Sequence, residues 1–305
     1  MINPRLTVVI ITYKQQDLIR RSLNSVLSQK EHGLKEIIIS DDCSPDNTWA
    51  TIMEYKNQYP EYIRPYRNSP NLGIYANLQK ALSYVKETDL VLMLSGDDEF
   101  CPGYFEQIVK CVQDNNIDLH SCYSILGDWK VVSPSGKETI FRQNIISKYQ
   151  KQYDPLSLKI RHIISGRSSA TSFEAVKKFK WVPVEYGVSY AENYFDIQPY
   201  LYSERFYHIP VVGSIYYSAV GVSRTMFNKT EYKRLADVYK SMQSHPTIME
   251  NPKDVLYLKH LVYKYNYLAC KSPVNLIKTV WFFIISYKYP VGLRKLMAET
   301  YHLFF

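Results

Sequence analysis

The sequence lacks the patterns that mark several common classes of protein. Its five cysteines are odd in number and include no Cys-x-x-Cys pair, which argues against a disulfide framework or a structural zinc site and favours reduced thiols in a cytosol. No window reaches the roughly 18 apolar residues needed to span a bilayer, and no basic-then-apolar signal region precedes the first predicted strand. The seven histidines include no His-x-x-x-His or His-Glu pair, so we expect no histidine-built metal site.

The remaining composition is that of a globular protein with a basic surplus. Hydrophobic residues make up 46% and charged residues 22% of the 305 residues, which is enough to bury a full core. Lys and Arg outnumber Asp and Glu by 37 to 29, and the formal charge of +8 suits diphosphate substrates, anionic lipid headgroups or nucleic acid. Clustered basic residues with interleaved aromatics are missing from the elements predicted for residues 1–224, so we do not expect a nucleic-acid partner.

The N-terminal part alternates between predicted strands and helices. Residues 6–12 form an apolar, β-branched run, which is typical of a strand buried on both faces, and residues 16–29 follow with helical spacing. The same alternation predicts strands over residues 36–40, 63–67 and 90–94 and helices over residues 48–59 and 74–85. Repeated strand–helix units favour a right-handed, mostly parallel sheet flanked by helices, which is an α/β fold.

From residue 102 onward the pattern is less regular. A helix is predicted over residues 102–115, and poor periodicity over residues 137–165 favours a long loop region with some helix. The other predicted elements are, in order, strand 119–126, strand 129–132, turn 133–136, helix 172–179, helix 190–203 and strand 207–217. After Arg224 the sequence predicts helices rich in basic and aromatic residues, over 232–243, 253–270, 274–287 and 291–302. We therefore expect one domain of residues 1–224 and a helical extension of residues 225–305.

Polar residues stand where three of the predicted strands end. Asp97 and Asp98 follow one apolar run, Asp41 and Asp42 follow another, and Thr12 ends the first. Ligands of open α/β sheets bind at the carboxyl ends of the strands, so we expect a binding site there. Paired carboxylates suit Mg²⁺ or Mn²⁺, which usually complete their coordination shell with substrate phosphates. The alternative is that Asp97 and Asp98 cap the turn and the helix that follows.

Four segments at these strand ends carry a family resemblance. They are Val8-Val-Ile-Ile-Thr-Tyr13, Ser40-Asp-Asp-Cys-Ser-Pro-Asp-Asn-Thr48, Asn71-Leu-Gly-Ile-Tyr-Ala-Asn77 and Leu94-Ser-Gly-Asp-Asp98. In order and spacing they resemble the nucleotide-sugar domain of family 2 glycosyltransferases with the GT-A fold, over about residues 6–224. A dinucleotide-binding fold is the natural competitor, but Tyr13 to Gln16 stand where that fold needs a Gly-x-Gly-x-x-Gly turn. The resemblance implies a Rossmann-like GT-A sheet and a nucleoside-diphosphate sugar donor.

The resemblance assigns the first two strand ends to the nucleoside. Thr12 and Tyr13 would hold a nucleobase and ribose with a hydroxyl and an aromatic face, and ordinary strand-end packing is the alternative. Asp41 and Asp42 would accept hydrogen bonds from the ring N–H of uracil or thymine and from ribose hydroxyls. For this pair the alternative is capping of the turn at residues 44–48.

A third segment is implied to close over the nucleotide. Asn71, Gly73 and Asn77 match it, but many relatives carry an arginine where this chain has Ala76. Positive charge for the diphosphate must then come from elsewhere. Arg224 ends a segment that resembles a flexible loop reaching the diphosphate in some relatives, and a solvated loop arginine is the alternative.

The last of the four segments matches the family's Asp-x-Asp motif, with Ser95 at its first acidic position. Asp97 corresponds to the second acidic residue and is the first choice as ligand of Mn²⁺ or Mg²⁺, with Asp98 next. The implied role of the metal is electrophilic, because negative charge grows on the departing nucleoside diphosphate as the glycosidic bond breaks. A single protein carboxylate with diphosphate oxygens can form such a site.

A late acidic residue is implied as the general base. Glu192 and Asn193 fall where relatives carry Glu-Asp, and Asn193 cannot accept a proton. Glu192 is therefore the leading candidate to deprotonate the acceptor hydroxyl, and Asp196, one helical turn away, is the reserve. An acidic residue that merely stabilises the first turn of its helix is the alternative.

The C-terminal tail has two interpretations. Trp281-Phe-Phe-Ile-Ile285 is apolar and aromatic, and Lys278 and Lys288 flank it. It is either an interfacial helix on the anionic inner face of the plasma membrane or a helix packed against the catalytic domain or a second subunit.

Taken together, the resemblance implies an inverting glycosyltransferase in the cytoplasm. It would transfer sugar from a nucleoside-diphosphate sugar, with uridine as the expected nucleoside, to a glycan or polyprenyl-diphosphate-linked acceptor. Many bacterial relatives build capsule or O-antigen units in this way. Ser95 and Asn193, at two positions that are usually acidic, motivate the alternative of a non-catalytic sugar-nucleotide-binding subunit of a polysaccharide assembly complex.

Overall fold

The computed structural model describes residues 3–143, 154–160, 167–180, 191–218, 220 and 228–286. The chain forms two compact units, one of residues 1–184 with 195–225 and one of residues 185–194 with 226–305. The division into a catalytic domain of residues 1–224 and a helical extension of residues 225–305 stays a prediction.

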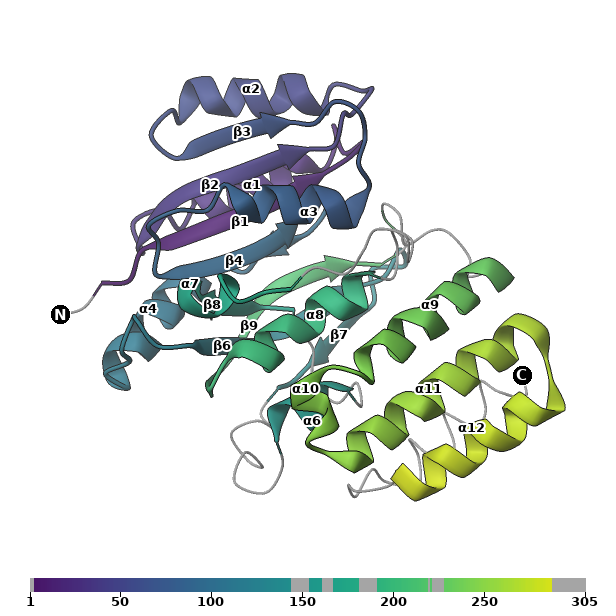
Figure 1. The fold of residues 1–305 in the computed structure, drawn as a ribbon. Helices are drawn as coiled ribbons and strands as arrows, with labels where there is room; N and C mark the ends of the chain where they lie inside the picture. Colours follow the sequence, from purple (N-terminus) through teal and green to yellow (C-terminus); the bar gives the residue numbers. More distant parts are fainter. Residues whose placement is uncertain are drawn as a thin grey trace. The chain divides into compact units, whose positions relative to one another are not determined.

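The first half of unit 1 is a parallel sheet with helical connections. Strands β1, β2 and β4 pair in register, so that Thr12 lies opposite Asp41 and Ile11 lies opposite Ser95. Helices α1, α2 and α3 flank these strands (Figure 1). The elements are β1 (Leu6–Thr12), α1 (Ile19–Leu27), β2 (Leu34–Asp41), α2 (Thr48–Gln58), β3 (Ile63–Arg67), α3 (Ile74–Ser83) and β4 (Leu90–Ser95). Each predicted strand and helix of this half is confirmed, with ends shifted by up to three residues.

The second half of unit 1 extends the same sheet with mixed pairing. Within the described residues the sheet has nine strands: eight follow the order β3-β2-β1-β4-β8-β6-β9-β5, and the ninth, β7, pairs with β6. Strand β8 is antiparallel to β4 and β6, whereas β6 and β9 are parallel. The elements are β5 (Glu99–Phe100), α4 (Tyr104–Asp114), β6 (Tyr123–Val132), β7 (Glu138–Phe141), α6 (Pro155–Ile160), β8 (Ser169–Ser172), α7 (Phe173–Val176), α8 (Ala191–Tyr202) and β9 (Arg205–Tyr217). The expected α/β fold class, a parallel-rich sheet flanked by helices, is confirmed.

Two sequence predictions were wrong in this half. The two strands predicted over residues 119–126 and 129–132 are one continuous strand, β6, whose register with β9 shifts around Asp128. Strands β5, β7 and β8 were not predicted, since all three are short and none carries a run of large apolar residues; β7 lies in the range 137–165 that was expected to be loop with some helix.

The core lies on both faces of the parallel strands. Val8 and Val9 point to opposite faces of β1, and both are fully buried. Ile38 and Ile39 of β2 likewise point to opposite faces and are 1% and 0% exposed. Burial on both faces is the reason these strands read as continuous β-branched runs. Leu23 of α1 packs into the same core and is also fully buried.

Tyr104 of α4 packs against two strands, β6 and β9, in the second half of the sheet. Its ring covers Gly127 of β6 and Gly213 of β9 so closely that a Cβ on Gly127 would lie 2.8 Å from the ring. Its hydroxyl donates to the Ser168 carbonyl oxygen at 2.5 Å, and burial raises the pKa of Tyr104 far above its usual value. The two glycines are therefore required by close approach, and the contact holds the chain at residue 168 against the sheet.

Unit 2 contains a bundle of helices. Tyr239 of α9 stacks on Tyr265 of α11 with ring centroids 5.6 Å apart, and Tyr263 of α11 stacks on Phe282 of α12 at 5.3 Å. The helices are α9 (Lys229–Met242), α10 (Pro246–Met249), α11 (Pro252–Cys270) and α12 (Pro273–Ser286). Among the described residues, no helix combines the length and apolar character needed to cross a bilayer. The helix predicted over residues 291–302 lies outside the described residues.

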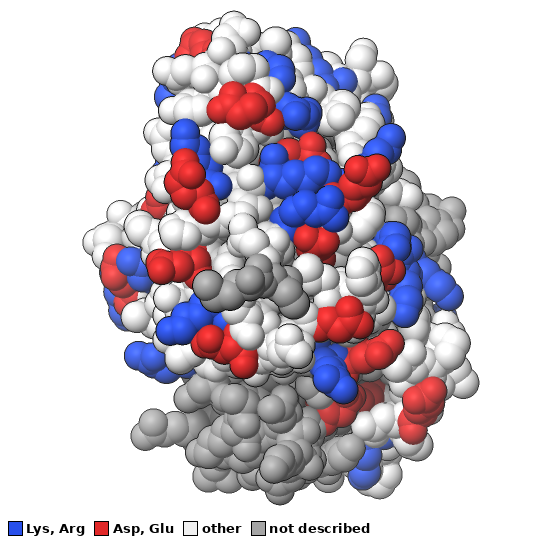
Figure 2. Space-filling model, turned by 90° about the vertical axis from the view of Figure 1, so that its left-hand side faces the viewer, with Lys and Arg blue, Asp and Glu red and all other residues white. Residues whose placement is uncertain are grey.

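Charged side chains of both signs lie interspersed on the face shown in Figure 2. An example of a surface pair is Arg20 with Glu54, whose side chains are 50% and 60% exposed. Exposed pairs of this kind contribute little to stability, because water already solvates both charges. The Lys and Arg side chains on the face in Figure 2 are not gathered into one basic surface, although the whole chain has a formal charge of +8.

Candidate functional site

The ends of β1, β2 and β4 meet at one edge of the sheet. The backbone N–H of Asp42 donates to the Thr12 carbonyl oxygen at 2.9 Å, and the N–H of Gly96 donates to the Ile11 carbonyl oxygen at 2.9 Å. Gly96 lies against the chain that leaves β1, since a Cβ there would meet Gln15 and come within 2.9 Å of Thr12 Oγ1. The structure thus brings the two Asp-Asp segments and the Thr12 segment together.

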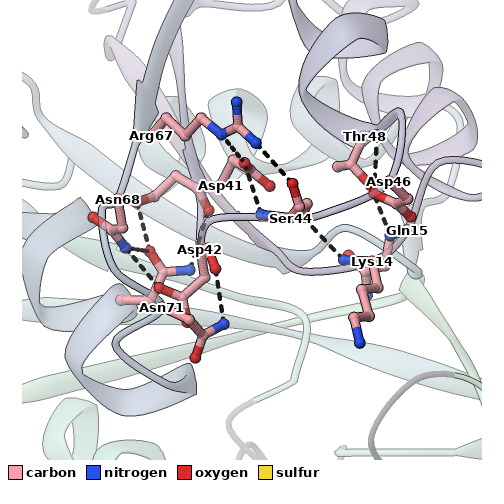
Figure 3. A network of polar contacts seen from close by, with 12 residues as sticks. Lys14, Gln15, Asp41, Asp42, Ser44, Asp46, Thr48, Arg67, Asn68 and Asn71 are labelled. Atoms are coloured by element: carbon pink, nitrogen blue, oxygen red, sulfur yellow. Dashed lines mark hydrogen bonds and ion pairs between the residues drawn. The ribbon is translucent and has the colours of Figure 1, made fainter.

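Asp41 is a fully buried carboxylate at this edge. One of its oxygens, Oδ2, lies 3.1 Å from Arg67 Nε and accepts from the Ser44 backbone N–H at 3.2 Å (Figure 3). The other oxygen, Oδ1, is buried and has no hydrogen-bond partner among the described residues. Burial raises the pKa of Asp41, against the hydrogen bonds from Ser44 and the charge of Arg67. Such an oxygen is a ready acceptor for an N–H group of a ligand.

Asp42 is occupied by contacts within the chain. Its carboxylate accepts from the backbone N–H groups of Leu72 at 2.8 Å and Gly73 at 2.7 Å, and from Asn68 Nδ2 at 2.9 Å. Asn71 Nδ2 donates to the Asp42 carbonyl oxygen at 2.8 Å. In this structure Asp42 therefore holds the turn that leads into α3, in addition to any contact it makes with a ligand.

Asn77 is part of the same buried network. Its Oδ1 accepts from Ser40 Oγ at 2.6 Å and from Asn68 Nδ2 at 2.9 Å, and its Nδ2 donates to the Ser40 carbonyl oxygen at 3.1 Å. Only 2% of Asn77 is exposed. Asn77 of α3 thus links that helix to Ser40 of β2 and to Asn68 through buried hydrogen bonds.

A second network joins the loops after β1 and β2. The backbone N–H of Lys14 donates to Ser44 Oγ at 3.0 Å, and that of Gln15 donates to Thr48 Oγ1 at 2.9 Å (Figure 3). Thr48 in turn donates to Asp46 at 2.6 Å. Burial alone would raise the pKa of Asp46, but the hydrogen bonds from Thr48 lower it. Asp46 therefore accepts from the first backbone N–H of α2, that of Thr48 at 3.1 Å, whereas the N-cap residue Asn47 makes no side-chain cap bond.

The two predicted residues at the end of β1 differ in exposure. Thr12 is 3% exposed, and its hydroxyl donates to Gln15 Oε1 at 2.7 Å. Tyr13 is 37% exposed, and Lys14 Nζ lies 5.2 Å from the centre of its ring. The Tyr13 ring is thus open to a ligand, whereas the Thr12 hydroxyl already has a partner.

Asp98 and Asp97 follow β4 as adjacent, largely buried carboxylates. Asp98 is 6% exposed, and burial together with the charge of Asp97 raises its pKa to about 7. It accepts from the Tyr217 backbone N–H at 3.2 Å and lies 3.8 Å from Arg167. Burial also raises the pKa of Asp97. Burial therefore disfavours the charged form of both carboxylates, and a bound cation would favour it.

Two arginines border this pair, and sequence reasoning missed both. Arg21 of α1 donates to the Asp97 carbonyl oxygen and stacks on the ring of Tyr217 at 3.6 Å. Its Nε is buried and has no hydrogen-bond partner among the described residues. Arg167 stacks on the ring of Tyr216 at 3.9 Å. Neither arginine had a signal in the sequence, because each meets the carboxylates only through the fold.

The carboxylate pair fits a divalent cation in its chemistry. Asp97 and Asp98 offer hard oxygen donors, as Mg²⁺ and Mn²⁺ require. Within the described ranges, no group of three or more His, Cys, Asp or Glu side chains is placed to hold a metal. A cation here would therefore rely on substrate oxygens for most of its coordination shell.

The predicted general base lies in helix α8. Glu192 is in the first turn of α8, and its side chain is outside the part of the structure that can be described. Asp196, one turn later, lies 3.3 Å from Nζ of Lys159, which is 9% exposed. Arg224 falls outside the described residues.

A match to a protein-family model identifies the family of this chain. The model described as glycosyl transferase family 2 matches residues 7–179, more than half of the chain and the whole of the edge described above. The chain belongs to glycosyl transferase family 2. The predicted family is thereby confirmed.

Curated relatives match this family 2 chain over parts of their length. An uncharacterised protein of Mycobacterium tuberculosis is 37% identical over 93 residues, which cover 30% of this chain and 27% of the relative. A processive diacylglycerol beta-glycosyltransferase of Mycoplasma pneumoniae is 27% identical, covering 41% of this chain and 36% of the relative. An abequosyltransferase of Salmonella typhimurium is 26% identical, covering 59% and 55%. The chain therefore spans between about a quarter and just over half of the length of these relatives.

Solved structures share the fold. Staphylococcus aureus TarS in complex with UDP-GlcNAc superposes with a TM-score of 0.65 at 13% identity, covering 91% of this chain and 79% of TarS. A mannosyltransferase from Pyrobaculum calidifontis in complex with GDP-Man and Mn²⁺ gives a TM-score of 0.55 at 15% identity, covering 99% and 81%. At these identities the likeness establishes the fold of the family 2 chain.

Proposed function

We propose that this family 2 chain is an inverting glycosyltransferase that uses a UDP-sugar and a divalent metal. The observation that carries the proposal is the unpartnered Oδ1 of Asp41, buried at the same sheet edge as Asp97 and Asp98. That edge combines an acceptor for a nucleobase with carboxylates for a metal–diphosphate. TarS, which shares the fold, has been solved with UDP-GlcNAc.

Asp41 favours particular nucleobases. Uracil, thymine and guanine carry a ring N–H that can donate to Asp41 Oδ1, whereas cytosine and adenine have no such donor in their common tautomers. Cytosine and adenine could donate to this oxygen only through their exocyclic amino groups, so we infer that the site prefers a base with a ring N–H. The exposed ring of Tyr13 would stack on the base. Uridine is the nucleoside that we propose.

The diphosphate would be held by Asp97 through the metal and by arginines. Mn²⁺ or Mg²⁺ bound at Asp97 would supply the electrophile for the leaving nucleoside diphosphate. Arg21 and Arg167 border the carboxylates and would supply the positive charge that Ala76 does not. The unpartnered Nε of Arg21 is a donor that a phosphate oxygen could accept from. Arg224 stays a prediction for the same role.

Glu192 would serve as the base in the transfer step. The acceptor hydroxyl oxygen forms a bond to the anomeric carbon of the donor sugar as the bond from that carbon to the diphosphate oxygen breaks. The hydroxyl proton passes to the carboxylate of Glu192, and the electron pair of the broken bond leaves with UDP. Attack opposite the leaving group inverts the anomeric centre.

The acceptor that we propose is a glycan or a polyprenyl-diphosphate-linked glycan at the inner face of the plasma membrane. Transfer to it would be a step in the synthesis of a cell-surface polysaccharide such as capsule or O-antigen. The names of two relatives, an abequosyltransferase and a diacylglycerol glycosyltransferase, support a surface glycan or lipid acceptor.

Donor hydrolysis tests the enzymatic proposal against its alternative. Incubated with UDP-glucose or UDP-GlcNAc and Mn²⁺, the chain is expected to release UDP slowly and to stop when the metal is chelated. Water then takes the place of the acceptor hydroxyl. Binding of both donors without release of UDP, under every acceptor tried, would instead support the non-catalytic subunit that Ser95 and Asn193 suggest.

A further inference from the structure

Helix α12 carries a row of exposed, large apolar side chains. Val274, Ile277, Trp281 and Ile284 are 58%, 68%, 60% and 61% exposed, and Val280 beside them is 37% exposed. Their spacing of three and four residues places them on one side of the helix, which we name the α12 stripe. A contiguous apolar surface of this kind marks an interaction site, whereas scattered single residues do not.

The opposite side of α12 is already packed against α11. Phe282 stacks on Tyr263 at 5.3 Å, and the ring of Phe283 lies 4.9 Å from that of His260. The carbonyl oxygen of Thr279, a fully buried residue, accepts from His260 Nδ1 at 2.9 Å. The α12 stripe is therefore not the surface that holds the α11–α12 pair together.

The charged residues in the sequence of α12 and of most of α11 have one sign. Residues 255–286 contain Lys259, Lys264, Lys271 and Lys278 and no Asp or Glu. Lys278 is exposed and follows Val274 by one helical turn, so it borders the stripe. An anionic bilayer complements this arrangement, since apolar side chains enter the acyl boundary and lysines meet lipid phosphates. A second copy of the chain would instead bring lysines toward lysines.

We propose that the α12 stripe docks this protein on anionic lipid bilayers. Helix α12 has 14 residues and is about 21 Å long, so it would lie in the interface and not span it. Trp281 is well suited to this position, because its ring is apolar and its indole N–H reaches the headgroups. Delivery of a lipid-linked acceptor to the enzyme rests on the proposed function, whereas bilayer binding does not.

Vesicle sedimentation of the full chain tests the proposal. The protein should bind phosphatidylcholine vesicles that contain phosphatidylglycerol more tightly than vesicles of phosphatidylcholine alone. The double variant Trp281→Ser with Ile284→Ser should bind at least about tenfold more weakly to both. Lys278→Glu should weaken binding about tenfold only where phosphatidylglycerol is present. The matched controls are Met249→Ser, which removes an apolar side chain that is 58% exposed outside the stripe, and Lys240→Glu on α9.

Each outcome decides for or against the docking surface. Weak binding of the wild-type chain to both vesicles, or equal losses in the Met249→Ser control, would overturn it. If light scattering shows that the double variant dissociates a dimer and its vesicle binding is unchanged, a second copy covers the stripe and the proposal is wrong. Helical circular dichroism of each variant reports folding, and UDP binding, measured alongside, separates a failed docking surface from a failed glycosyltransferase assignment.

Discussion

Replacing Asp97 with alanine is expected to weaken UDP binding in the presence of Mn²⁺ by about 100-fold, because the cation loses its first protein carboxylate. Without metal, the wild type and Asp97→Ala should bind UDP equally weakly, since the contact at Asp41 is intact in both. Calorimetric titration of UDP with and without Mn²⁺ measures both quantities. Asp97→Asn should resemble the alanine variant, because an amide keeps the shape and loses the charge.

The controls for Asp97 come from carboxylates in other surroundings. Asp114→Ala removes an exposed carboxylate from α4 and should leave UDP binding unchanged. Asp98→Asn should lower the affinity less than Asp97→Ala, since the Asp98 carboxylate already accepts from Tyr217 and lies beside Arg167. Metal-dependent binding that survives in Asp97→Ala would move the cation to Asp98. Binding that is indifferent to metal in every variant would refute the metal assignment.

The sequence predicted the elements that a local pattern encodes. Strand β3 begins and ends where it was expected, and β1 and β2 were found because both faces of each strand are buried and the residues are accordingly β-branched. The meeting of Asp41 and Asp97 at one edge followed from the same reasoning. Carboxyl ends of parallel strands lie together whatever the side chains do.

Strand β8 shows why other elements escaped prediction. It consists of Ser169, Ala170, Thr171 and Ser172, at most 5% exposed. Its polar side chains are buried because they pair across strands, as Thr171 does with Ser124 at 3.1 Å. A buried strand built of small polar residues has neither the apolar run nor the alternation on which sequence patterns depend. Only the neighbouring strands make its burial favourable.

The meeting of the strand ends was predictable from the sequence, and the contacts that their side chains make were not. A pair of aspartates after a strand looks the same whether an oxygen is free, as at Asp41, or occupied by backbone N–H groups, as at Asp42. Those donors are the backbone N–H groups of Leu72 and Gly73, which follow β3 in the sequence. Arg167 reaches Asp98 from a segment without periodicity. The fold determines long-range partners of this kind, so the local spacing of residues in the sequence does not predict them.

Glu192 is the proposed general base of the transfer step. Glu192→Gln is expected to lower kcat for transfer by about 10²- to 10⁴-fold, because the acceptor hydroxyl loses the group that takes its proton. Affinities for UDP and Mn²⁺ should stay at the wild-type value, since neither ligand depends on that carboxylate. Steady-state transfer rates and calorimetry on the same preparation separate the two effects.

Asp196→Asn is the informative counterpart, because residues 192 and 196 are one helical turn apart in α8. Asp196 already lies 3.3 Å from Lys159, a largely buried lysine whose charge it balances. Its loss should therefore lower thermal stability and change kcat less than tenfold, which is less than about 1.4 kcal/mol in activation free energy. A large fall in kcat for Asp196→Asn with little change for Glu192→Gln would reverse the assignment. Because the Asp196 carboxylate is already paired with Lys159 Nζ, we propose a structural role for Asp196 and the role of base for Glu192.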